Sequence, residues 1–85
     1  MRNVQLRLNY DEKFDVLYVA FADVSNSYGD DSEPGLIYLR DMDTDALTGV
    51  TFMHFKAKLR AGCLPELESD VPVDYDELVR VFEQN

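Results

Sequence analysis

Two short strand-like segments near the N-terminus constrain the fold more than any other feature, and the first of them alternates in hydrophobicity with a period of two. In residues 4–10, apolar and polar side chains alternate, as they do in a half-buried strand. Residues 15–21 are apolar on both faces, which is typical of a central strand or of one covered by a helix or a partner chain. Only the polar residues 11–13 separate the two segments, so we expect an antiparallel hairpin.

A second pair of strands is predicted further along the chain. Residues 36–40 and residues 47–55 are the strand segments, and the acidic residues 41–45 form the turn between them. Gly49 lies inside the later segment, where a glycine indicates a bulge or a close approach of two backbones.

The remaining central segments carry weaker signals. Residues 23–35 combine Ser, Asn, Gly, Pro and acidic side chains, a composition that predicts a mobile surface loop. Residues 55–61 fit both a strand and a short helix, and we favour a helix or an irregular extension because four strands already complete a small sheet. Residues 62–65 contain a glycine and a proline and end this element.

The C-terminal residues 73–83 predict a helix with a defined start. Asp74 and Glu77 have the spacing of a capping box, and Val73 and Leu78 are placed for a hydrophobic staple. A helix of about ten residues is marginal alone, so it must dock on the sheet. We therefore expect one α+β domain over residues 1–85, with a small antiparallel sheet of about four strands in two hairpins and the C-terminal helix packed on one face.

Charge and length narrow the possible partners and compartments. The 85 residues carry a net charge of −9, which repels nucleic-acid backbones and anionic membranes, so we expect neither as a partner. No apolar run reaches the length of a membrane span, and residues 1–5 show no signal-peptide pattern. The single cysteine, Cys63, has no internal disulfide partner, which favours a reducing cytoplasmic compartment.

The first hairpin resembles a known bacterial family, the domain of unknown function 2283. Its signature is Tyr-Asp, three variable residues, Asp, a small apolar residue, Leu-Tyr and Ile or Val, and it is complete in Tyr10-Asp11-Glu12-Lys13-Phe14-Asp15-Val16-Leu17-Tyr18-Val19. Residues 35–39 and 49–53 are similar to later parts of the family pattern, within a family-like sheet region of residues 4–60. The chain departs from the pattern at Thr51, where Glu is common, and at Ala46, in a tighter connection that lacks the turn glycine.

This resemblance implies a compact antiparallel sheet in a prokaryotic or phage cytoplasmic protein. The family has no assigned activity and supplies no catalytic residues. Its members are encoded beside small basic toxin-like proteins, and the resemblance therefore implies an antitoxin-like role for this chain.

The acidic turn is the first candidate for metal chemistry. Asp41, Asp43 and Asp45 match the start of a calcium-binding loop. The rest of that loop is missing, because Ala46 stands where the loop needs Gly and Phe52 stands where it needs a bidentate Glu. We therefore interpret the turn as one whose Asp side chains bond nearby amides, and we predict no metal site.

Other catalytic arrangements have little support. His54 and Cys63 are the only residues of their kinds, too few for zinc, and no helix N-terminus next to Cys63 activates its thiol. We interpret His54 as a surface or half-buried strand residue and Cys63 as a small apolar filler. The paired carboxylates lie in turns or at a helix start, where they stay ionised. We predict no catalytic residue and no cofactor.

The favoured hypothesis is a non-catalytic domain that binds a basic protein, in an antitoxin-like or regulatory role, because a dense acidic surface steers such partners toward it. One alternative is a small enzyme or a domain that binds a small ligand or a divalent metal. A second alternative is a self-associating module, including a homodimer that uses the basic patch of residues 54–60. The candidate partner-binding residues are an aromatic anchor and its acidic neighbours: Tyr28, Asp30, Asp31, Glu33, Asp41, Asp43 and Asp45.

Overall fold

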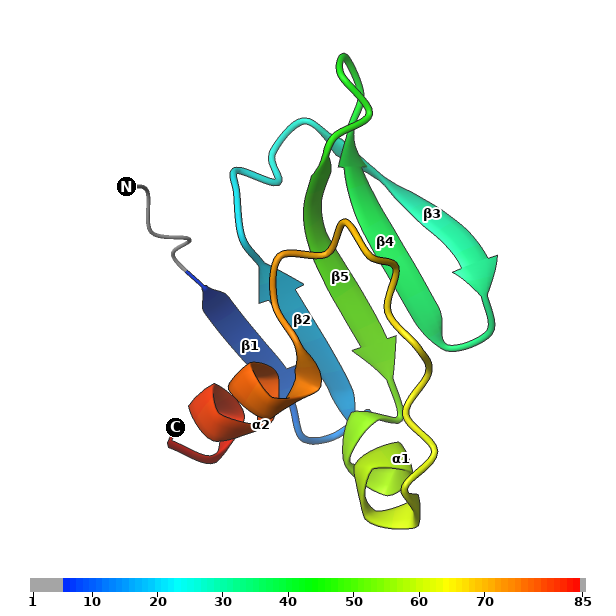
Figure 1. Ribbon diagram of the computed structural model, residues 1–85, viewed down its shortest axis with the longest axis vertical. Coiled ribbons are helices and arrows are strands. Elements are labelled where there is room, and N and C mark those ends of the chain that lie inside the picture. Colours follow the sequence, from blue (N-terminus) through cyan, green and yellow to red (C-terminus); the bar gives the residue numbers. More distant parts are fainter. Residues whose placement is uncertain (1–5, 85) are drawn as a thin grey trace.

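The computed structural model describes residues 6–84 and shows a five-stranded antiparallel sheet with two helices (Figure 1). The predicted α+β class with a C-terminal helix is confirmed, but the sheet has five strands instead of about four. Residues 4 and 5 of the first expected strand lie outside the described residues. In chain order the elements are β1 (Arg7–Asp11), β2 (Val16–Ala20), β3 (Ser27–Glu33), β4 (Leu36–Asp41), β5 (Leu47–Met53), α1 (Phe55–Ala61) and α2 (Tyr75–Gln84).

The strand order β1-β2-β5-β4-β3 makes β2 an inner strand and leaves β1 and β3 at the two edges. β1 and β2 form the predicted hairpin, in which Leu8 lies opposite Val19 and Tyr10 lies opposite Leu17. β2 then pairs with β5, which places Leu17 beside Phe52. Side chains opposite each other share a face, so these residues build one apolar side of the sheet.

The expectation of a mobile loop over residues 23–35 is wrong, because residues 27–33 form the edge strand β3. β3 pairs with β4 from Ser27, opposite Asp41, to Glu33, opposite Leu36, with a bulge between Asp30 and Glu33. The sequence of β3 has no alternation of apolar and polar residues. One polar contact that holds it is the hydrogen bond between the hydroxyl groups of Ser27 and Thr48, at 2.8 Å. The backbone ladder, and not side-chain burial, makes this segment a strand.

Gly49 meets both expectations for a glycine inside a strand. The pairing of β4 with β5 shifts between Leu39 and Arg40, which is a bulge next to Gly49. A Cβ atom at Gly49 would lie 2.5 Å from the carbonyl oxygen of Val19 on β2. A side chain at this position would push β2 and β5 apart.

Residues 55–61 form the short helix α1, and Asp15 from the first hairpin caps it. The two carboxylate oxygens of Asp15 accept the backbone N–H groups of Lys56 at 2.8 Å and Ala57 at 3.1 Å, and its carbonyl accepts that of Phe55. The Tyr10 hydroxyl donates to the same carboxylate at 2.7 Å. This cap connects residues 41 positions apart in the chain and satisfies amides that a helix start otherwise leaves free.

The hydrogen bonds at this cap change two pKa values. Partial burial opposes ionisation of Asp15, but the bonds from Tyr10, Lys56 and Ala57 outweigh it and lower the pKa of the carboxyl. The bond to Asp15, with smaller effects of burial and of the Asp15 charge, raises the pKa of Tyr10 to about 12. Asp15 also adopts a left-handed backbone with φ of 57°, which Asp tolerates better than most residues.

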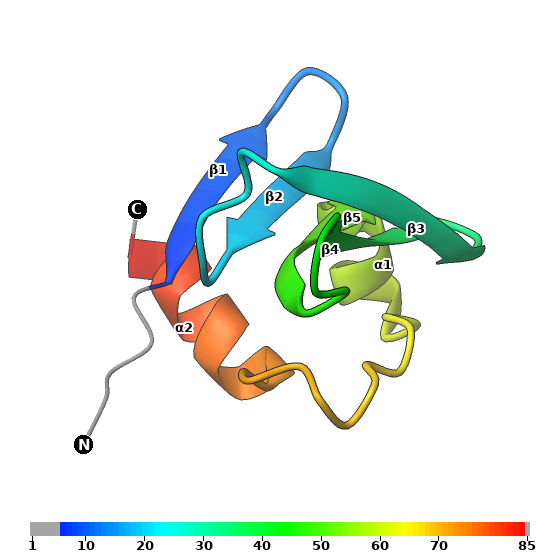
Figure 2. The same cartoon turned by 90° about the horizontal axis from the view of Figure 1, so that it is seen from above.

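Helix α2 and the connecting residues 62–74, here called the strap, cover the apolar face of the sheet (Figure 2). The Asp74 carboxylate accepts the Glu77 N–H at 3.0 Å, one bond of the predicted capping box. Leu78 is fully buried, and the Phe82 ring packs edge-on against the rings of Tyr10 and Phe55. Burial of a leucine of this kind contributes about 2 kcal/mol.

The opposite face of the sheet has no described helix on it (Figure 2). Tyr18 of β2 is 45 % exposed there, whereas Val16 and Thr51 on the same face are buried. An apolar hollow of ≈ 270 Å³ lies on this face, with Ala20 and Leu39 in its lining. No helix in residues 6–84 is long and apolar enough to cross a membrane.

Candidate protein-binding surface

Arg40 of β4 is the central cation on the polar part of the sheet face that the strap and α2 cover. Its Nε lies 3.2 Å from a carboxylate oxygen of Asp30, and its Nη2 lies 3.2 Å from one of Glu68 on the strap. Desolvation alone lowers the pKa of Arg40, but the Asp30 bond and the nearby negative charges outweigh it, so that the pKa is raised. Both ion pairs that residues 6–84 form use this one guanidinium.

Tyr28 lies opposite this arginine on the edge strand β3, and its side chain is on the same face of the sheet. Its hydroxyl donates to the carboxylate of Asp45, and this bond, more than burial or charge, raises the pKa of Tyr28. The Asp45 carbonyl in turn accepts the Arg40 Nη1–H at 3.3 Å. The Tyr28 ring remains 40 % exposed, so a partner can contact it.

Acidic side chains from β3 and the strap approach Tyr38 at the centre of β4. The Tyr38 hydroxyl accepts the Glu68 N–H at 3.1 Å, which fixes the strap over the strand. Burial is the main reason that the pKa of Tyr38 is raised, and the charges of Glu68, Glu33 and Asp70 raise it further. Negative potential therefore extends from β3 across β4 to the strap.

The structure brings four of the seven predicted partner-binding residues together. We call the resulting group the acidic surface; it consists of Tyr28, Asp30, Glu33 and Asp45, joined by Glu68 and Asp70 of the strap.

The other three predicted residues have different positions. Asp31 is exposed next to the bulge of β3, and Asp43 accepts a bond from the Asn26 side chain at 3.0 Å. Asp41 braces the turn by accepting the N–H groups of Asp43 at 2.8 Å and Thr44 at 3.1 Å, as predicted for a turn of this composition. Within residues 6–84, no three His, Cys, Asp or Glu side chains come together as a metal site.

Sequence reasoning missed Arg40 and Glu68. One signal was available for Arg40: it continues the alternation of Leu36 and Tyr38, so its side chain faces the core side and needs a carboxylate partner. Nothing local marked Glu68, because its partner lies 28 positions away in the chain.

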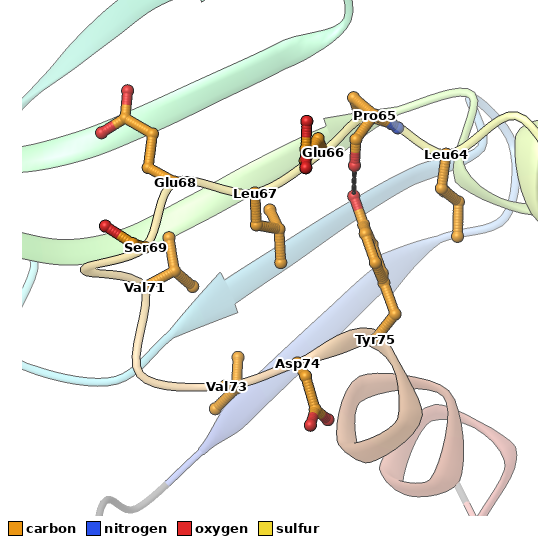
Figure 3. Close-up of a pocket in the computed structure, with 10 residues that line it drawn as sticks. All are labelled: Leu64, Pro65, Glu66, Leu67, Glu68, Ser69, Val71, Val73, Asp74 and Tyr75. Carbon is orange, nitrogen blue, oxygen red and sulfur yellow. Dashed lines mark hydrogen bonds between the residues drawn. The ribbon is translucent and has the colours of Figure 1, made fainter.

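A pocket opens in the strap beside the acidic surface (Figure 3). It has a volume of ≈ 510 Å³, and Leu67, Val71 and Val73 point into the space that the strap encloses. Glu68 and Asp74 also line the pocket, with their carboxylates directed outward, and the Tyr75 hydroxyl donates to the Pro65 carbonyl across one end. Apolar walls with acidic edges suit the aliphatic stem and cationic head of a lysine or arginine side chain.

His54 and Cys63 lie at opposite ends of α1. His54 is exposed, as expected for a surface residue, but it does not belong to a strand: β5 ends at Met53, and His54 precedes the helix with a left-handed backbone. Cys63 is exposed, which corrects the expectation of an apolar filler. Helix α1 ends at Gly62, directly before Cys63. Gly62 has a left-handed backbone, and its N–H donates a hydrogen bond to the Leu59 carbonyl at 3.2 Å.

No protein-family model, curated protein or solved structure matches this chain. The resemblance of the first hairpin to the domain of unknown function 2283 therefore stays a prediction. Two residues of that pattern have a structural role in this chain: the Asp15 carboxylate caps α1, and the Tyr10 hydroxyl donates to that carboxylate.

Proposed function

We propose that this protein is a non-catalytic domain that binds a basic protein through the acidic surface. The observation that carries the proposal is the convergence of carboxylates from β3, the β4–β5 turn and the strap around one arginine. Arg40 cannot neutralise them all, so the surface keeps a negative charge that a cationic partner can offset. The resemblance to the domain of unknown function 2283 supports an antitoxin-like or regulatory version of this role.

The shape of the region adds to the charge. Tyr28 offers a partly exposed ring of the kind enriched at binding hot spots. The strap pocket offers apolar walls beside the carboxylates, so a lysine or arginine of the partner can bury its alkyl chain there. Charge then guides the approach of the partner, and these two features hold it.

The state of the acidic groups favours binding over acid–base catalysis. Catalysis of that kind needs a carboxyl whose pKa is raised by desolvation. Every described Asp and Glu is half-buried or exposed. The pKa values of Asp15 and Asp23 are both lowered, because the hydrogen bonds that these carboxylates accept outweigh desolvation.

Titration calorimetry with a blocked peptide of alternating lysine and valine tests this function. We expect binding that weakens at least about tenfold when the salt concentration rises from about 0.05 M to about 0.5 M, because salt screens exposed charges. The triple variant Asp30→Asn, Glu33→Gln and Asp45→Asn removes three charges of the acidic surface and should weaken binding by a similar factor.

A matched control separates local charge from net charge. Glu12→Gln, Asp76→Asn and Glu83→Gln also remove three negative charges, from exposed positions outside the acidic surface, so both variants change the net charge from −9 to −6. The control variant should bind the peptide nearly as well as the unmodified protein. Equal loss in the two variants would show that only net charge matters, and absence of peptide binding would refute the proposal.

A further inference from the structure

β3 has a backbone edge that no described element covers. The strand order places β4 on one side of β3 and ends the sheet on the other (Figures 1 and 2). The polar backbone groups along such an edge form a template for another strand.

The pairing with β4 identifies which groups face outward. The Met42 N–H bonds the Asn26 carbonyl at 2.9 Å, so residue 26 turns its backbone toward β4. Backbone groups alternate in direction along a strand, so Tyr28 and Asp30 also turn toward β4, whereas Ser27 and Gly29 turn to the open side. The Ser27 N–H is taken by the Val24 carbonyl at 3.1 Å. The free edge therefore offers the Gly29 N–H and the carbonyls of Ser27 and Gly29.

The side chains along this edge select what can pair with it. Asp30, Asp31 and Glu33 give the strand three carboxylates, and Arg40 offsets only Asp30 within it. Two copies of β3 laid edge to edge would bring acids close to acids, which is destabilising. A segment with alternating cationic side chains would instead place opposite charges together.

We propose that β3 accepts an extended basic segment of the partner as a sixth strand of the sheet. This inference rests on the proposed function and specifies the conformation of the bound segment. Hydrogen bonds to Gly29 and Ser27 hold the backbone of the segment. Its alternating lysine or arginine side chains all lie on one face and meet Asp30 and Glu33, which share the face of their β4 partners Tyr38 and Leu36. The acidic side chains and the bulge at the end of β3, which protect an edge against self-pairing, leave the edge open to a basic strand.

Two substitutions at Gly29 test the strand pairing. Gly29→Pro removes the outward N–H but no bond to β4, a placement that edge strands tolerate. Gly29→Ala keeps the N–H, and its Cβ would lie 3.1 Å from Cγ2 of Ile37, so that side chain must shift slightly. We expect the alternating lysine–valine peptide to bind the proline variant at least about tenfold more weakly than the alanine variant.

Hydrogen exchange of the unmodified protein gives a second readout, which does not depend on how either variant folds. Saturating peptide should slow exchange of the Gly29 amide at least about tenfold, because a hydrogen bond protects it. If the peptide binds with the expected salt dependence but leaves Gly29 exchange unchanged, strand addition is overturned while the proposed function stands. If the unmodified protein binds no peptide, both fail. If Gly29 exchange slows with protein concentration alone, a second copy occupies the edge and the inference is wrong.

Discussion

The two halves of one sheet face differ sharply in what stabilises them. Under β1, β2 and β5, the face is apolar, and α2 covers it with Leu78 and Phe82. Under β4 and β3, the same face carries Arg40 with its two carboxylate partners, and the covering element is the strap.

This difference separates the side chains that stabilise the fold from those that we propose bind a partner. The apolar half buries side chains that a small domain of 85 residues needs in order to fold. The two ion pairs of the acidic half contribute less, at most about 1 kcal/mol each, because the carboxylates of Asp30 and Glu68 are partly exposed. The charges of this half therefore remain available to a partner without weakening the core.

The largest effect is expected in the apolar half. Leu78→Ala should lower the free energy of unfolding by about 3 kcal/mol, since it removes buried methyl groups and leaves a cavity under α2. Urea denaturation measures this change. Val79→Ala, at the next and half-buried position, is the control and should cost clearly less. Equal losses would mean that α2 does not dock through Leu78.

A smaller effect is expected where the hairpin caps α1. Asp15→Ala should cost about 1 to 2 kcal/mol at pH 7 through loss of the cap. Asp15→Asn should cost less, because Asn keeps one accepting oxygen and tolerates a positive φ.

The contribution of Asp15 should also depend on pH. Its folded pKa lies below the ordinary value of 3.8, so its ionised form stabilises the fold above that pH and this stabilisation is lost as the pH falls through the lowered value. The difference in unfolding free energy between the protein and Asp15→Asn should therefore shrink below about pH 4. A difference that grows on acidification would contradict the cap.

The smallest stability effect is expected in the acidic half. Arg40→Gln should lower the unfolding free energy by about 1 kcal/mol or less. It should also strengthen binding of the lysine–valine peptide at low salt, because Asp30 and Glu68 lose their internal cation. Thermal unfolding and calorimetry check the two parts. Weaker peptide binding by this variant would mean that Arg40 itself contacts the partner.

Sequence patterns predicted the elements whose signals are local. The β1–β2 hairpin follows from two strand-like segments, residues 4–10 and 15–21, with a short polar separator, and the start of α2 follows from the spacing of Asp74 and Glu77. β3 has no such signal, because its pairing with β4 and its bond to Thr48 depend on distant residues. The choice of helix over strand at α1 likewise depends on Asp15, far away in the chain.

The candidate site was predictable only in part for the same reason. The acidic composition of residues 28–33 and 41–45 marked the region, and Tyr28 lies in it as an exposed ring. Which of these acidic side chains lie close together depends on contacts between strands that are far apart in the chain. Arg40 forms ion pairs with Asp30 and Glu68, whereas the Asp41 carboxylate accepts a hydrogen bond from a backbone N–H group of its own turn.

The remote cap of α1 has a consequence for the order in which the chain folds. A helix of seven residues is too short to persist alone, and its stabilising carboxylate arrives only when β2 has paired with β5. We therefore expect the strands to pair first and α1 to form afterwards, because pairing of strands far apart in the chain is slow. Substitutions in α1 should then act mainly on the rate of unfolding and leave the rate of folding nearly unchanged.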